Sequence, residues 1–75
     1  MIKVGQVWET TNKYKVVVTS IKEEDYKGQV CIIYDDGYTT DSYEDNDFTF
    51  SKLLAEYQTW QEAVNSKEFN GEKNE

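Results

Sequence analysis

The regular spacing of turn-forming residues constrains this chain more than any other feature of its sequence. Over the first fifty positions, polar interruptions recur at about 11–13, 23–28, 35–37 and 44–47. A spacing of roughly 8–12 residues between turns is typical of a small β-barrel or β-sandwich. The segments between the turns are short and rich in β-branched and aromatic residues, which favour strands over helices. We therefore expect a mainly β fold.

Five segments carry the strand pattern, and one of them is apolar on both faces. That segment, Val30–Tyr34, is expected in the interior of the sheet. The dipeptide Asp36-Gly37 predicts a hairpin with a type I′ turn, because both residues tolerate a positive φ. The predicted strands are Val4–Thr10, Tyr14–Ile21, Val30–Tyr34, Tyr38–Tyr43 and Phe48–Phe50.

The periodicity of apolar residues changes after residue 50. Ser51 is a candidate helix N-cap, and the apolar positions that follow it have helical spacing. We therefore predict an amphipathic helix over about 51–65 that packs against the strands at about 4–50. The apolar stripe of this helix consists of Leu53, Leu54, Tyr57, Trp60 and Val64.

A second, shorter helical turn is expected near the C-terminal end of the sequence. Asn65 and Glu68 have the spacing of a capping box, so a short turn that buries Phe69 and ends at Gly71 is predicted. We expect a single domain over 1–69 and a flexible tail over 70–75.

Composition excludes several classes of protein. The chain has 75 residues, a net charge of -7, a pI near 4.4, a single Cys, and neither His nor Arg. These features argue against a disulfide, a zinc site or direct binding of nucleic acid. No apolar run is long enough to span a membrane, and the start lacks the apolar stretch of a signal peptide. A cytoplasmic protein with no cofactor is therefore expected.

Catalysis has few candidate residues in this sequence. Without His, the usual general base near neutral pH is absent. The paired acids Asp35 with Asp36 and Asp45 with Asp47 fall in predicted turns, where solvent keeps them ionised. Cys31 lies in the most apolar predicted strand, so a buried, inert thiol is expected. We predict that the protein is not an enzyme.

Calcium binding through an EF-hand loop is also rejected. A loop that starts at Asp45 places Glu56 correctly at position twelve, but Phe50 replaces the glycine needed at position six. A loop that starts at Asp41 places Lys52 at position twelve. No metal ligands are therefore predicted.

The negative charge is concentrated in one segment. Residues 1–34 carry five Lys and four acids, for a net charge of +1, and residues 51–75 carry three Lys and five acids, for -2. Residues 35–50 carry six acids and no Lys, for -6. One interpretation is an edge strand that charge keeps from aggregating. The other is a functional face: acids two apart in a strand project from one side about 7 Å apart, and such a row can compete with phosphates for a basic groove.

Aromatic residues form a second candidate face, near the strand ends and the predicted hairpin. Such positions can line a groove for an extended or Pro-rich peptide, or a cage for a cation. Trp8 is expected in the core, and Tyr38 and Tyr43 are expected to be exposed. The aromatic residues of this face are Trp8, Tyr14, Tyr34, Tyr38 and Tyr43. The residues predicted to bind a partner are Asp35, Asp36, Tyr38, Asp41, Tyr43, Glu44, Asp45 and Asp47.

Two parts of the chain resemble known families. The segments Gly5-Gln6-Val7-Trp8, Tyr14-Lys15-Val16 and Ile33-Tyr34-Asp35-Asp36-Gly37 resemble the strand order of SH3-like and Tudor-like barrels. The segment Trp60–Phe69 resembles the C-terminal ends of small proteins from phages and prophages of Gram-positive bacteria. These resemblances imply a five-stranded SH3-like barrel with a C-terminal amphipathic helix. They also imply an accessory phage protein, a group that includes inhibitors of host defence nucleases.

The leading hypothesis is a non-enzymatic protein that binds a basic surface of a host protein through its acidic face. The host protein would be a CRISPR-type or other defence nuclease. The acids would mimic nucleic-acid phosphates and occupy the groove in which the nuclease binds nucleic acid. The alternative is an SH3-like or Tudor-like peptide-binding module, or a component of phage assembly. The oligomeric state stays open.

Overall fold

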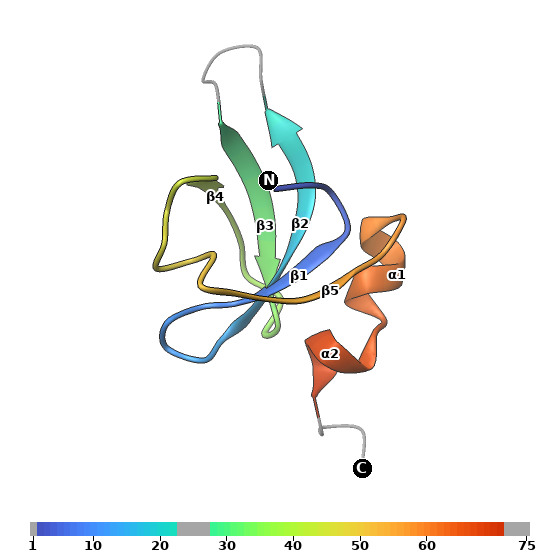
Figure 1. Cartoon of the computed structure of the whole chain (residues 1–75). Coiled ribbons are helices and arrows are strands. Elements are labelled where there is room, and N and C mark those ends of the chain that lie inside the picture. The colour runs from blue at the N-terminus through green and yellow to red at the C-terminus, as the bar shows by residue number, and fades with distance from the viewer. Residues whose placement is uncertain (1, 23–27, 72–75) are drawn as a thin grey trace.

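The computed structural model describes residues 2–22 and 28–71 of the chain. The fold is mainly β, with five strands followed by two short helices (Figure 1). The strands are β1 (Gln6–Glu9), β2 (Lys15–Lys22), β3 (Gln29–Tyr34), β4 (Thr39–Tyr43) and β5 (Lys52–Glu56). The helices are α1 (Trp60–Val64) and α2 (Lys67–Asn70).

All five strands belong to one antiparallel sheet, in the order β4-β3-β2-β1-β5. The first four strands follow each other as neighbours, and β5 returns to pair with the free side of β1. The sheet is not closed, so β4 and β5 form its two edges. The register shifts at two places, between Val7 and Trp8 in β1 and between Val18 and Ser20 in β2.

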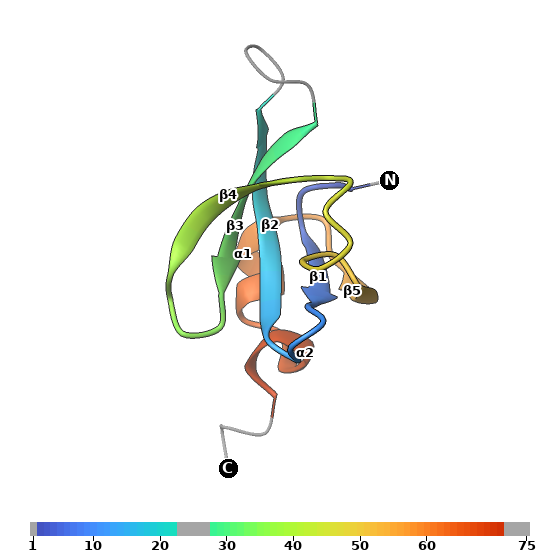
Figure 2. The ribbon, with the colours of Figure 1, turned by 90° about the vertical axis from the view of Figure 1, so that its left-hand side faces the viewer.

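The sheet carries a hydrophobic core on each face, because successive side chains of a strand point to opposite sides. Val16 and Val18 of β2 belong to the first core, with Val30 and Ile32 of β3 and with Phe50. Residue Val17, which lies between them in β2, belongs to the second core. This core also contains Val7 of β1, Ala63 of α1 and Phe69 of α2. Both helices therefore lie against the same side of the sheet (Figures 1 and 2).

Four of the five predicted strands are confirmed to within about two residues, and Val30–Tyr34 is interior as predicted, with β2 and β4 on its two sides. The fifth prediction is wrong. Phe48–Phe50 is not a strand but part of a turn, in which the side chain of Asn46 accepts hydrogen bonds from the amides of Phe48 and Thr49. Most of the predicted turn at 23–28 lies outside the described residues.

The predicted helix over 51–65 is correct only for Trp60–Val64, because the first part of the predicted range is β5. Lys52–Glu56 pairs with β1, whose free edge supplies backbone hydrogen-bond partners. The bulge lies in β5, where Leu54 is the extra residue opposite Val7 and Trp8, and it lets Leu54 and Ala55, which are adjacent in sequence, both pack against the helix-side core. This arrangement hides the alternating pattern of a strand and imitates the spacing of a helix.

The helical part begins only at Trp60. Its N-cap is Thr59 rather than Ser51, and the cap forms a capping box: Thr59 Oγ1 accepts from the amide of Glu62, and Glu62 Oε1 accepts from the amide of Thr59. The short second turn is confirmed, with Phe69 buried and Gly71 as its C-cap. Its N-cap is Ser66, whose hydroxyl accepts from the amide of Phe69, so the predicted capping box from Asn65 to Glu68 is wrong. Asn65 is instead the C-cap of α1.

The C-terminal boundary of the ordered part differs slightly from the prediction. Asn70, assigned to the flexible tail, belongs to α2, and its side-chain amide donates hydrogen bonds to the carbonyls of Val64 and Ser66. Residues 72–75 lie outside the described part of the chain. No helix among the residues that the structure describes is long and apolar enough to cross a membrane.

Candidate functional site

The turn between β3 and β4 organises the first part of the candidate site. The amide of Gly37 donates to the carbonyl of Tyr34, and the amide of Tyr34 donates to the carbonyl of Tyr38. Gly37 has a φ of 95°, whereas the φ of Asp36 is not positive. The hairpin is therefore confirmed, but the predicted type I′ turn is wrong. The loop has three residues and consists of a type I turn followed by Gly37 in the left-handed region.

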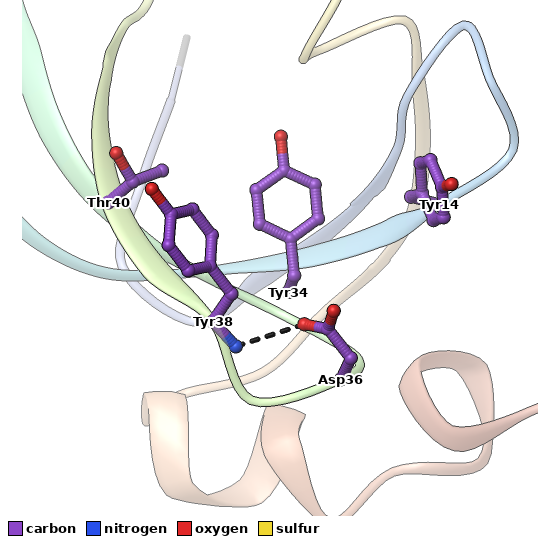
Figure 3. A pocket seen from close by; sticks show the side chains of 5 residues that line it. All are labelled: Tyr14, Tyr34, Asp36, Tyr38 and Thr40. Atoms are coloured by element: carbon purple, nitrogen blue, oxygen red, sulfur yellow. Dashed lines mark hydrogen bonds between the residues drawn. The ribbon is translucent and has the colours of Figure 1, made fainter.

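Three tyrosine rings and one carboxylate surround a hollow beside this turn (Figure 3). Tyr34 is the middle ring: its centroid lies 6.2 Å from that of Tyr14 and 6.1 Å from that of Tyr38. The outer two rings are largely exposed, at 56% for Tyr14 and 62% for Tyr38. The hollow has a volume of about 270 Å³. Its lining, which we call the tyrosine hollow, consists of Tyr14, Tyr34, Asp36, Tyr38 and Thr40.

The tyrosine hollow combines an apolar aromatic surface with one fixed negative charge. Asp36 Oδ1 accepts a hydrogen bond of 3.0 Å from the amide of Tyr38, which orients the carboxylate. Tyr34 packs against the first core, so the middle ring rests on buried side chains of the sheet. Aromatic faces attract cations and also stack on prolines and extended backbone. The hollow can therefore hold an apolar or positively charged side chain.

The six acids of residues 35–50 lie along edge strand β4 and in the turns at its two ends. We call this set the acidic edge: Asp35, Asp36, Asp41, Glu44, Asp45 and Asp47. All of them are exposed except Asp35, which is half-buried. The expectation that these acids form a row on one face of a strand is wrong. Only Asp41 lies in a strand, and the other five lie in the two turns.

Asp41 differs from the other members of the acidic edge because it is already engaged within the sheet. Its Oδ2 accepts from Lys22 Nζ at 3.3 Å and from Gln29 Nε2 at 3.4 Å, and its Oδ1 accepts from Cys31 Sγ at 3.2 Å. The hydrogen bond from Cys31, followed by that from Lys22, lowers the pKa of Asp41 below its ordinary value. This carboxylate therefore stays ionised, with its charge largely balanced by Lys22.

The remaining five acids have no lysine at ion-pair distance within residues 2–22 and 28–71. The three ion pairs found there join Glu9 to Lys13, Glu9 to Lys15, and Asp41 to Lys22. Glu44 and Asp45 line a second hollow with Gly28 and Tyr43, of about 300 Å³. Negative charge therefore accumulates at both ends of β4 rather than along it.

The two exposed tyrosines that the sequence singled out are not brought together. Both are exposed as expected, with Tyr43 at 46%. However, they stand at opposite ends of β4, and an odd number of positions separates them, so they point to opposite faces of the sheet. Tyr38 belongs to the tyrosine hollow with Thr40, whereas Tyr43 faces the second hollow.

Two further expectations have different outcomes. Trp8 belongs to the core, as predicted: its ring lies edge-on to Phe50 at 5.5 Å, and its indole N–H donates to Gln6 Oε1. Cys31 was expected to be fully buried but is half-buried, because it faces Asp41 across the edge pair β3–β4. The contact of Cys31 with Asp41 depends on strand register, which no local sequence pattern reveals.

The described part of the chain contains no cluster of three His, Cys, Asp or Glu side chains placed to hold a metal ion. Comparison of the chain with protein-family models, with curated proteins and with solved structures finds no significant match.

Proposed function

We propose that this chain is a non-enzymatic interaction protein that binds a basic surface of another protein through its acidic edge. One observation carries the proposal: five of the six acids in residues 35–50 have no lysine partner among the described residues, and all five lie beside the same edge strand. Ionised side chains gathered in two turns attract a positively charged partner over about 10 Å at ordinary salt concentrations.

The proposed partner is a host protein whose basic groove normally holds nucleic-acid phosphates. Clusters of carboxylates can replace phosphates in such a groove because both displace the same condensed counterions. The resemblance to small phage and prophage proteins makes a defence nuclease, such as one of CRISPR type, a suitable partner class. We further propose that the scaffold is an SH3-like barrel, a proposal supported by the strand order in which β5 returns to β1.

The experiment compares two neutralised variants with a control of equal charge change. Asp35→Asn with Asp36→Asn removes the charge at one end of β4, and Glu44→Gln with Asp45→Asn removes it at the other. Glu56→Gln with Glu62→Gln is the control, because a glutamine can keep both the hydrogen bond from Gln6 and the capping box at Thr59. Each tagged protein is used to capture partners from host lysate at two salt concentrations.

If the proposal is correct, the original chain and the control capture partner proteins at low salt, and the neutralised variants do not capture them. It also expects high salt to release these partners. If the neutralised variants retain the same proteins as the control, the acidic edge does not bind them and the proposal is wrong.

A second candidate function is peptide binding at the tyrosine hollow. The packing of Tyr14 and Tyr38 on either side of Tyr34 favours it, since exposed aromatic rings are typical anchors for peptides. Here Tyr38→Ala would abolish capture of the partner, Tyr43→Ala would not, and high salt would have little effect. The response to salt therefore separates the two functions.

A further inference from the structure

Edge strand β4 has a hydrogen-bonding side that no other strand of the described chain occupies. Residues Thr39–Tyr43 pair with β3, and β4 ends the sheet on that side. Figure 2 shows β4 at the left-hand margin, away from both helices. An edge of this kind presents backbone N–H and C=O groups that an extended segment of another protein can pair with.

Charge distinguishes this edge from the opposite one. Strand β5 begins with Lys52 and ends with Glu56, so its ends carry opposite charges. Strand β4 is preceded by Asp35 and Asp36 and followed by Glu44 and Asp45, with no lysine anywhere in residues 35–50. A segment that pairs with β4 therefore meets negative charge at both of its ends.

The centre of β4 does not favour a basic residue in the segment that pairs with it. Asp41 already accepts hydrogen bonds from Lys22 and Cys31, which hold its carboxylate toward the interior of the sheet. A basic residue at the middle of the segment would gain little there. Five strand residues span about 17 Å, so the preferred segment has basic residues at both ends of a short uncharged stretch with high β propensity.

A second copy of this chain is a poor occupant for the same reason. An antiparallel pair of β4 strands would bring Asp35 and Asp36 of one copy toward Glu44 and Asp45 of the other. Like charges that face each other across strands destabilise the pairing. The acids therefore discourage self-association of the edge and leave it open to a basic strand.

From these observations we propose that β4 binds its partner by strand addition, and that the partner segment is an extended stretch of about five residues with basic residues at both ends. This inference rests on the proposed function and names the mode by which the acidic edge binds. Backbone pairing with β4 supplies the register, and the four acids at the two ends supply the charge selectivity.

The test uses a synthetic peptide, acetyl-KRTVTVTKR-amide, and two N-methylated forms of it. One form carries N-methyl groups on the two valines, and the other on the two outer threonines. Because alternate amides of a strand point to opposite sides, only one of these forms loses the N–H groups that face β4. Dissociation constants are measured by fluorescence anisotropy with a labelled peptide at low salt, for the original chain and for the three double variants described above.

Strand addition predicts that one N-methylated form binds at least about tenfold more weakly, while the other binds like the unmodified peptide. It also predicts that each neutralised variant weakens binding severalfold and that the control with Glu56→Gln and Glu62→Gln does not. Hydrogen exchange of the amides in 39–43 should slow when the peptide binds.

Two results would overturn the inference: no binding of the unmodified peptide, or equal effects of the two N-methylated forms. If either occurs while the neutralised variants still lose their lysate partners, the acidic edge binds proteins by another mode and the proposed function stands. If neutralisation changes neither kind of binding, both proposals are wrong.

Discussion

The backbone amide of Tyr57 donates a hydrogen bond of 2.9 Å to the carbonyl oxygen of Gly5, which joins the end of β5 to the start of β1. The two chain segments approach so closely that a Cβ atom on Gly5 would lie 2.2 Å from the carbonyl oxygen of Tyr57. Gly5 also has a φ of 95°, in the region that side chains rarely adopt. Both space and backbone conformation therefore require glycine at this position.

The substitution Gly5→Ala should lower the free energy of unfolding by about 3 kcal/mol, because it adds a backbone clash to the cost of a positive φ. Gly37→Ala is the matched control. Gly37 has the same φ of 95°, but a Cβ atom added there would meet nothing within 4 Å, so only the conformational cost of about 1 kcal/mol is expected. Urea denaturation measures both. Equal losses would contradict the close approach at Gly5.

The N-cap of α1 allows a direct comparison of two hydroxyl residues. Thr59→Ala removes the side chain that accepts from the amide of Glu62 and should cost about 1 kcal/mol. Ser51→Ala should cost much less, because Ser51 is exposed and precedes a strand rather than a helix. Thermal unfolding followed by circular dichroism measures both variants. A larger loss for Ser51→Ala would support a helix that begins at residue 51.

Docking of α2 depends on Phe69, which is only 5% exposed. Phe69→Ala should cost about 3–5 kcal/mol, since it leaves a cavity in the core that α1, α2 and the sheet share. If that variant does not fold, Phe69→Leu should still fold with a loss of about 1 kcal/mol.

Trp60 provides the comparison for Phe69 because it is the larger side chain but is 37% exposed. Trp60→Ala should cost about 1 kcal/mol, less than Phe69→Ala. Denaturation in urea would reveal the order. A greater loss at Trp60 would mean that Trp60, as the helical stripe predicted, faces the sheet.

A side-chain hydrogen bond links α2 to the residue that follows β5. Tyr57 donates from its hydroxyl to Glu68 Oε1. This bond raises the pKa of Tyr57 above its ordinary value of 10.0 and lowers the pKa of Glu68 below its ordinary value of 4.5. The two shifts have opposite signs because the bond needs a protonated phenol and an ionised carboxylate.

The contribution of this bond to stability should depend on pH in both directions. The lowered pKa of Glu68 gives stability that is present above the ordinary value of 4.5 and is lost as the pH falls through the folded-state value. The raised pKa of Tyr57 gives stability that is present below 10.0 and is lost as the pH rises through the folded-state value. The stability difference between the original chain and Tyr57→Phe should therefore be largest between about pH 5 and pH 9.

Urea denaturation at a series of pH values tests this dependence. Tyr43→Phe is the control, since it removes an exposed hydroxyl for which the described residues show no hydrogen bond. A difference between the original chain and Tyr57→Phe that stays constant from pH 3 to neutral pH would contradict the linkage with Glu68.

The sequence predicts the first four strands well because each of them lies between clear turn signals. It fails at β5, where Leu53 and Leu54 fit the spacing of a helix as readily as that of a strand. What decides the matter is the free edge of β1, about fifty residues earlier in the chain. Local periodicity carries no information about a pairing strand that is distant in sequence. The prediction of Ser51 as an N-cap is wrong for the same reason, because it depends on the assignment of 52–56 to a helix.

For the candidate site, the sequence identifies residue types but not their arrangement. The concentration of acids in 35–50 is a property of the sequence, and their division between the two ends of β4 follows only from where the strand begins and ends. Tyr14, Tyr34 and Tyr38 could be recognised as candidates, but their grouping around one hollow depends on the pairing of β2 with β3 and of β3 with β4. The separation of Tyr38 from Tyr43, by contrast, follows from the alternation of side chains along the predicted strand Tyr38–Tyr43.

Strand β2 supplies Val17 to the core beneath the helices and Val16 and Val18 to the core on the other face. Neither layer can therefore come apart without disturbing the strand that the other layer needs. Tyr34, the middle ring of the tyrosine hollow, rests on the core that contains Val16 and Val18. Consequently, a substitution that loosens α1 or α2 should be transmitted through β2 to the opposite face, and occupancy of the tyrosine hollow should in turn hold the helices in place.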